Sequence, residues 1–193
     1  SLANGSIVSY AWDLDNDGFF DDATGVSNTY NFGPAGTYTV GLRVTTDQGC
    51  ISNTYQSVTV NPNPTVDFTY TDVCIGDTTQ FMGMGNVASG SIVSYAWDLD
   101  DDGVFAEASG QNISHLFTTT GTQEVGLQVT TDNGCTATII KVVTISPLPV
   151  VQLDGEDVCE GETISFSNTS INQVGTISYE WDFGDGNTSN EVE

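Results

Sequence analysis

The stretch SIVSYAWDLDNDG, residues 6–18, sets the period of the whole chain. It returns as SIVSYAWDLDDDG at residues 91–103, an offset of 85 residues from position 6 to position 91. A third and more divergent copy, YEWDFGDG, occupies residues 179–186. Each copy joins a short apolar run ending in tryptophan to a run of aspartates. A fixed period of this length indicates an array of similar folded units rather than one large domain.

Proline-rich junctions separate the units. NPNP occupies residues 61–64 and SPLP residues 146–149. Proline lacks an amide donor and has a stiff backbone, so it ends strands and restricts the angle between neighbours. The predicted units are a partial repeat with the later strands at 1–61, a complete repeat at 62–146 and a partial repeat with the early strands at 147–193. We expect the given chain to be a segment of a longer array of repeats. Alternatively, its incomplete ends complete each other between subunits of a filament.

Apolar and polar residues alternate within each unit. In TYTVGLRVTT (37–46), Tyr38, Leu42 and the other even-numbered residues fall on one face, as in a strand with one buried side. The turns TTDQGC and TTDNGC predict hairpins in which Gly49 and Gly134 take a positive φ. Further strands are expected in TVDFTYT from 65, TTQFMG from 78, IVSYAW from 92 and ATIIKVVTI from 137.

Short strands without any helical periodicity predict an all-β fold. A tryptophan on the third strand of each repeat is typical of an immunoglobulin-like β-sandwich, so we expect tandem sandwiches of about 85 residues. Trp12, Trp97 and Trp181 then belong to the sandwich core. The alternative is that these rings form a platform for stacking glycans.

The aspartates behind the first tryptophan follow the spacing D-x-D-x-D-G: Asp13, Asp15, Asp17 and Gly18. In calcium loops of this spacing, alternate carboxylates converge on one ion and the glycine permits a sharp turn. Carboxylates roughly 5 Å apart repel by about 1 kcal/mol per pair even in water. A divalent cation reverses that repulsion, and hard oxygen ligands without His or Cys favour calcium (Ca²⁺).

The predicted ligands come from the first two copies of the loop. They are Asp13, Asp15, Asp17, the backbone carbonyl of Phe19, Asp21, Asp98, Asp100, Asp102 and Glu107. Weaker candidates are Asp22, Asp182 and Asp185. Thr24 stands where an EF-hand has its bidentate glutamate, and no helices flank the loop, so only the ligand spacing of an EF-hand is expected. Alternatively, the aspartates only cap backbone amides in a tight, solvated turn.

The charge of the chain restricts its partners. It has 26 Asp and Glu against 2 Lys and Arg, a formal net charge of -24, which argues against nucleic acid and anionic membranes. No stretch approaches the roughly 18 apolar residues of a membrane span, so direct membrane insertion is not expected. The one histidine, His115, replaces Tyr30 of the preceding copy, which predicts a partly buried aromatic position. Without a nucleophile and base pair, and with carboxylates in a repeated turn, catalysis is not expected.

The motifs resemble the polycystic kidney disease (PKD) repeat, whose hallmark W-D-F-G-D-G stands unchanged at 181–186. The first two copies depart from it with DLDNDG and DLDDDG. The resemblance implies Ig-like modules that act as spacers or adhesive stalks on cell surfaces, including large adhesins of gliding bacteria, or that accompany catalytic domains of secreted enzymes.

From this resemblance and the composition we expect a calcium-stiffened segment of an extracellular stalk, at the cell surface or secreted. Its expected partners are neighbouring repeats of the same array or filament. The alternatives are a protomer of an extracellular filament and an accessory module of a secreted enzyme that binds glycans or a surface protein.

The four cysteines, Cys50, Cys74, Cys135 and Cys159, recur at regular positions. Without a CxxC pair they favour disulfides in an oxidising compartment over a metal site. One hypothesis joins Cys74 to the hairpin cysteine of the third unit, beyond residue 193, and Cys135 to a cysteine before residue 1. The rival hypothesis joins Cys74 to Cys135 within one unit.

Overall fold

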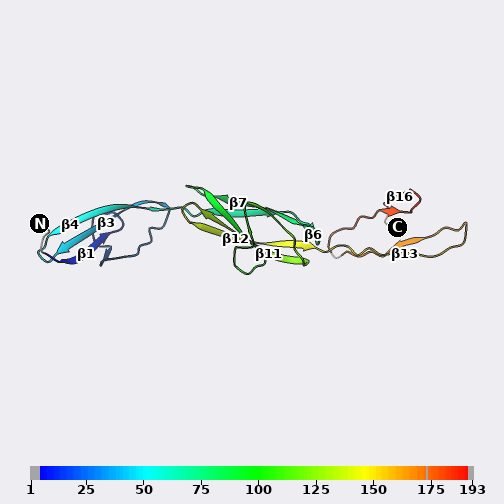
Figure 1. Cartoon of the computed structure of the whole chain (residues 1–193), viewed down its shortest axis with the longest axis horizontal. Coiled ribbons are helices and arrows are strands. Elements are labelled where there is room, and N and C mark those ends of the chain that lie inside the picture. The colour runs from blue at the N-terminus through cyan, green and yellow to red at the C-terminus, as the bar shows by residue number, and fades with distance from the viewer. Residues whose placement is uncertain (1–4, 173, 191–193) are drawn as a thin grey trace. The chain divides into compact units, whose positions relative to one another are not determined.

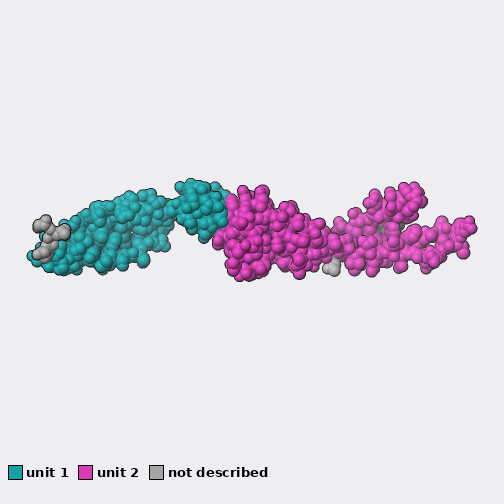
Figure 2. Space-filling model, in the orientation of Figure 1, with its two compact units in different colours: residues 1–66, 85–94, 129–137 teal, residues 67–84, 95–128, 138–193 magenta. Residues whose placement is uncertain are grey.

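The computed structural model describes residues 5–172 and 174–190. Every regular element in these residues is a strand, as the alternating patterns predict (Figure 1). The described part accordingly contains no helix long and apolar enough to cross a membrane. The chain falls into two compact units, which are residues 1–66, 85–94 and 129–137, and residues 67–84, 95–128 and 138–193 (Figure 2). The predicted repeat boundaries stay a prediction.

The first part of the chain forms one antiparallel sheet in the order β2-β1-β3-β4. Its strands are β1 (Ile7–Asp13), β2 (Ala23–Thr24), β3 (Gly36–Thr46) and β4 (Ile51–Val60). Strands β3 and β4 pair from Gly36 and Val60 to Thr45 and Ile51. The turn between them contains Gly49 at a φ of 74°, which a side chain would disfavour, so the predicted hairpin is confirmed.

The middle part forms two sheets, one above the other in Figure 1, in the orders β10-β7-β5 and β6-β12-β11-β8-β9. The strands are β5 (Thr65–Tyr70), β6 (Val73–Cys74), β7 (Thr79–Asn86), β8 (Ile92–Asp98), β9 (Ala108–Ser109), β10 (Asn112–His115), β11 (Gly121–Thr131) and β12 (Thr136–Ser146). The alternation seen in the sequence places Phe81 in the core and leaves Gln80 and Met82 exposed on β7. A two-sheet sandwich confirms the predicted fold class.

Trp97 lies at the centre of this sandwich and is fully buried. The centroid of its ring system is 5.2 Å from that of Phe68 and 5.5 Å from that of Phe81, both on the facing sheet. The indole Nε1 donates a hydrogen bond of 2.9 Å to the carbonyl of Gly110, so the polar atom of the ring is satisfied. The core role predicted for this tryptophan is confirmed.

Trp12 and Trp181 are only partly buried. Residues 5–60 align with 90–145 at the repeat offset, so they include no copy of the β5 and β7 strands whose phenylalanines cover Trp97. Among the described residues, the last part of the chain has four short strands in two pairs, β13 with β14 and β15 with β16. They are β13 (Leu153–Gly155), β14 (Phe166–Asn168), β15 (Trp181–Asp182) and β16 (Thr188–Ser189).

Candidate metal centre

Two groups of carboxylates converge in the structure, one after β1 and one after β8. The first joins Asp13, Asp15 and Asp17, and the second joins Asp98, Asp100 and Glu107. Within each group, one oxygen of every residue lies within 4.8 Å of the others. The clustering predicted from the sequence therefore occurs in both loops, although the two groups are not built from equivalent residues.

The first loop turns sharply because two residues adopt positive φ angles. Asn16 has a φ of 61° and Gly18 a φ of 90°. The N–H of Gly18 then donates 3.2 Å to Asp13 Oδ2, and the N–H of Phe19 donates 2.8 Å to Asp17 Oδ1. The aspartates thus cap backbone amides of the turn, as the alternative without a metal ion expects. These bonds leave further carboxylate oxygens free.

Asp13 is buried at the end of β1, opposite Gly41 of β3, and its side chain is 1% exposed. Its Oδ1 atom has no hydrogen-bond partner in the described residues. Leaving a buried acceptor unsatisfied costs about 1–3 kcal/mol, and more for a charged group. A cation placed among these carboxylates would satisfy that oxygen, so the residues present fit a hard metal ion.

The second loop has positive φ angles at the equivalent residues but differs in the hydrogen bonds of its leading aspartate. Asp101 has a φ of 61° and Gly103 a φ of 81°. Asp98, which is 3% exposed, accepts the N–H of Asp101 on Oδ1 at 2.8 Å and the N–H of Gly103 on Oδ2 at 3.0 Å. Both oxygens of the buried carboxylate therefore have partners, unlike those of Asp13.

Asp22 and Glu107 occupy equivalent positions at the repeat offset and both hold the start of their loop. Asp22 Oδ2 accepts the N–H groups of Leu14 at 2.6 Å and Asp15 at 3.2 Å. Glu107 Oε2 accepts the N–H of Leu99 at 3.3 Å and also belongs to the second carboxylate group. The sequence analysis ranked Asp22 below Asp21, although aligning the copies at the 85-residue offset pairs Asp22 with Glu107.

Three other predicted ligands lie outside the two groups. Asp21 belongs to neither, and neither does Asp102, whose Oδ1 accepts the N–H of Val104 at 2.7 Å. The side chain of Phe19 is 68% exposed, and its N–H bonds to the loop itself. Their predicted ligand roles stay predictions.

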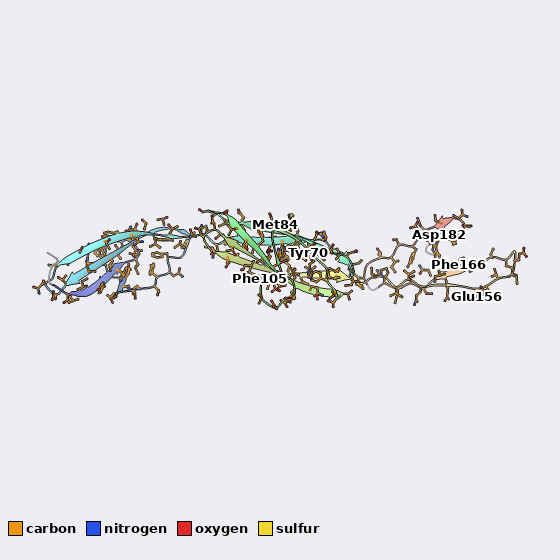
Figure 3. All side chains as sticks on the ribbon, in the orientation of Figure 1. Tyr70, Met84, Phe105, Glu156, Phe166 and Asp182 are labelled. Carbon is orange, nitrogen blue, oxygen red and sulfur yellow. The ribbon has the colours of Figure 1, made fainter. Side chains whose placement is uncertain are left out.

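An aromatic ring holds each loop against the sheet, and the sequence analysis missed it. The ring of Phe105 (Figure 3) lies against the backbone of Gly126 in β11. A Cβ added at Gly126 would be 2.9 Å from the Phe105 ring and 3.2 Å from Cβ of Asp98. At the equivalent Gly41, a Cβ would be 3.1 Å from Phe20. The repetition of phenylalanine and glycine at the 85-residue offset is the signal that could have identified these positions.

The third copy does not form such a group in the described residues. Asp182 Oδ1 accepts the N–H of Gly184 at 2.9 Å. Asp185 accepts both the N–H and the side-chain amide of Asn187, each at 2.9 Å, and the backbone bond, followed by the side-chain bond, lowers the pKa of Asp185. These residues have the geometry of a capped turn.

Neither of the two basic side chains forms an ion pair with the acidic loops in the described residues. Lys141 pairs with Asp67 at 2.6 Å and thereby lowers the pKa of that carboxyl, and its Nζ also donates to the carbonyl of Phe68. The guanidinium of Arg43 lies 4.0 Å from the centroid of Phe20, and its Nε donates to Asn53. In the described part, no ion pair neutralises either acidic loop.

His115 and the cysteines complete the predicted positions. His115 is partly buried against Phe117, with ring centroids 4.5 Å apart, and burial lowers its pKa, which confirms the aromatic position.

All four cysteines are free thiols. Cys74 pairs with Ser146 at one end of β12, whereas Cys135 directly precedes the other end. Ten residues of extended strand span roughly 33 Å, so the rival bond within one unit is wrong for this structure.

Comparisons with known proteins agree with the motifs. Residues 1–62, 61–145 and 146–193 each match the family model of the PKD domain. The chain is 30% identical over 144 residues to the pre-pro-metalloprotease PrtV of Vibrio cholerae, in strains M66-2 and ATCC 39315. That alignment covers 74% of this chain, which spans 15% of the length of these relatives.

Two solved structures are similar to parts of the chain. The PKD1 domain of Vibrio anguillarum Epp is 26% identical with a TM-score of 0.40, and the match covers 45% of this chain and 96% of that domain. The fibronectin(III)-like modules of Clostridium thermocellum CbhA are 10% identical with a TM-score of 0.43, covering 76% of this chain and 82% of that one.

Proposed function

The chain belongs to the PKD domain family along its whole length, and on that premise we propose that it is a run of calcium-stabilised, non-catalytic modules of an extracellular protein. The complete middle module folds around its own core, and the modules act as spacers. The acidic loops after β1 and β8 each hold one calcium ion, which resists unfolding of the module. The spacer holds an adhesive or catalytic part of the protein away from the surface that carries it.

The buried, unpartnered Oδ1 of Asp13 carries this proposal. A buried carboxylate oxygen without a partner, on a residue that is 1% exposed, destabilises the fold unless a cation or donor reaches it. Asp15 and Asp17 each place one oxygen within 4.8 Å of an oxygen of Asp13, and no basic side chain of the described residues pairs with them. Repulsion among three carboxylates and the desolvation of one of them would both be relieved by a single divalent ion.

The residues that would hold the ions are Asp13, Asp15 and Asp17 in the first loop and Asp98, Asp100 and Glu107 in the second. Bound calcium would supply positive charge and link the loop to the end of the strand before it. The chain itself positions the ligands: Gly18 and Gly103 close the turns, and Asp22 and Glu107 hold the loop amides. Without His or Cys in either group, oxygen-binding ions are favoured over zinc or copper.

The extracellular setting is supported by the chemistry of the chain and by its relatives. Extracellular modules bind calcium with dissociation constants of about 10⁻⁴–10⁻³ M, which suits open loops of this kind. PrtV of Vibrio cholerae is a pre-pro-metalloprotease, so an accessory position beside a catalytic domain is one form of the proposal. A stalk that carries an adhesive part is the other form. In both, the modules bear load and do not catalyse.

Thermal unfolding tests the calcium part of this proposal. We expect 10 mM calcium to raise the unfolding temperature of the two loop-bearing modules by about 6 to 20 °C over EGTA, since ten to a hundred times the dissociation constant adds about 1.4 to 2.7 kcal/mol. Differential scanning calorimetry of the 193-residue chain measures the shift.

Magnesium at the same concentration is the control, because it dehydrates reluctantly and demands octahedral geometry, so its effect should be smaller. The double variant Asp13→Asn, Asp98→Asn should lose the calcium response. Identical melting curves in calcium and EGTA for the unchanged protein would contradict the proposed role of the ion.

A further inference from the structure

The two acidic loops differ in how far each satisfies its own carboxylates, and we infer that the loop after β1 binds calcium more tightly than the loop after β8. The inference rests on the proposed calcium function and concerns the order in which the two sites fill. It follows from the hydrogen bonds of Asp13 and Asp98, which occupy equivalent positions at the repeat offset.

The number of carboxylates and the burial of the leading aspartates do not distinguish the loops. Residues 13–22 and 98–107 contain the same number of carboxylates. They are Asp13, Asp15, Asp17, Asp21 and Asp22 in the first and Asp98, Asp100, Asp101, Asp102 and Glu107 in the second. The leading aspartates are 1% and 3% exposed. The left-handed residues Asn16 and Asp101 share a φ of 61°. The loops differ in nearby positive charge, because the Arg43 guanidinium lies 4.0 Å from the ring centroid of Phe20 in the first copy and Gln128 stands at the equivalent position of the second. This charge acts against a cation at the first loop, so the inferred order depends on the hydrogen bonds described next.

The leading aspartates differ in what their Oδ1 atoms contact. Oδ1 of Asp13 is buried and has no partner, whereas Oδ1 of Asp98 accepts the N–H of Asp101 at 2.8 Å. That amide hydrogen carries a partial positive charge and opposes a cation that approaches the same oxygen. At Asp13 a cation relieves an unsatisfied acceptor, and at Asp98 it has to weaken an existing bond.

The third member of each group differs as well. In the first loop Asp22 holds the amides of Leu14 and Asp15, and three other aspartates form the carboxylate group. In the second loop Glu107 has both tasks, because it accepts the N–H of Leu99 and belongs to the group itself. An ion bound by Glu107 therefore shares that carboxylate with the amide of Leu99, which adds to the disadvantage of the second site.

One hydrogen bond to a charged group is worth enough to change an affinity by about tenfold or more. We therefore expect at least a tenfold difference in dissociation constant, with the first loop filling at the lower calcium concentration. Modules of one chain would then be stabilised in sequence as calcium rises.

Isothermal titration of the calcium-free 193-residue chain with calcium chloride tests the order of filling. The unchanged chain should show two classes of site. Asp15→Asn should remove the tighter class and Asp100→Asn the weaker class. Both side chains are exposed and leave the buried aspartates intact, so these matched variants are expected to fold. Calorimetric unfolding in EGTA, compared with that of the unchanged chain, checks that they do.

Equal dissociation constants, or loss of the weaker class in Asp15→Asn and of the tighter class in Asp100→Asn, would overturn the inference and leave the calcium function standing. Absence of binding to the unchanged chain up to 10 mM calcium, about ten times the upper dissociation constant expected of extracellular modules, would overturn both. The substitution Asp101→Pro gives a second test of which class of site belongs to the second loop. Proline cannot adopt the positive φ of Asp101, so the substitution should disrupt that loop. It should leave the tighter class unchanged, and a change in that class would reverse the assignment.

Discussion

Replacing Trp97 by alanine should unfold the middle module at temperatures well below the transition of the unchanged protein. The indole is fully buried, and the centroid of its ring system is 5.2 Å from that of Phe68 and 5.5 Å from that of Phe81. Removing a buried aromatic residue costs about 3–5 kcal/mol, a large part of the roughly 5–15 kcal/mol that stabilises a domain. The unfolding temperature of this module should therefore fall by about 12 °C or more.

Trp12→Ala is the matched control for that loss. Trp12 donates the same 2.9 Å bond, from Nε1 to the carbonyl of Gly25, that Trp97 donates to Gly110. Both variants lose one hydrogen bond, but Trp12 is only partly buried, so its loss should be clearly smaller. Hydrogen exchange of the β7 and β12 amides identifies the transition of the middle module. Equal losses in the two variants would contradict the central role of Trp97 in the core.

Replacing Gly126 by alanine should destabilise the middle module by about 1–3 kcal/mol, as overpacking does. Alanine in place of a strand glycine would otherwise stabilise by roughly 0.5–1 kcal/mol, because glycine loses more freedom on folding. Here the new Cβ would be 2.9 Å from the Phe105 ring and 3.2 Å from Cβ of Asp98, so the ring has to move away from the sheet. Calcium affinity at the second loop should fall along with stability.

A double-mutant cycle with Phe105→Ala separates this contact from other effects. If the clash with the ring causes the loss, Gly126→Ala should cost much less when the ring is absent, with a coupling of about 0.5–3 kcal/mol. Denaturant unfolding of the four proteins measures it. Strictly additive losses would show that the ring does not couple the loop to β11.

The longer strands of the chain could be predicted because each shows a local sequence pattern. The alternation around Tyr38 and Leu42 identifies β3, and the turn glycine Gly49 has the positive φ that the hairpin requires. The two-residue strands β2, β6 and β9 carry no such pattern, since two residues cannot show a period. Their positions depend on pairing with strands distant in sequence, which one sequence does not reveal.

The acidic loops were predictable as carboxylate clusters but not as sets of ligands. The spacing of Asp13, Asp15 and Asp17 is local, and the structure brings them together. An EF-hand register assigned the next ligand position to Asp21, although Asp22 is the residue that holds the loop amides. The unpartnered oxygen of Asp13 depends on burial opposite Gly41, which is a property of the folded sheet.

The most direct test of the account is a crystal structure of the chain grown with calcium, with anomalous scattering data collected to locate the ion. The account predicts an anomalous peak bound by Asp13, Asp15 and Asp17, with Oδ1 of Asp13 at about 2.3–2.6 Å from it. A well-ordered first loop without a peak, in which Oδ1 of Asp13 instead bonds to water or an amide, would contradict the calcium-stabilised module.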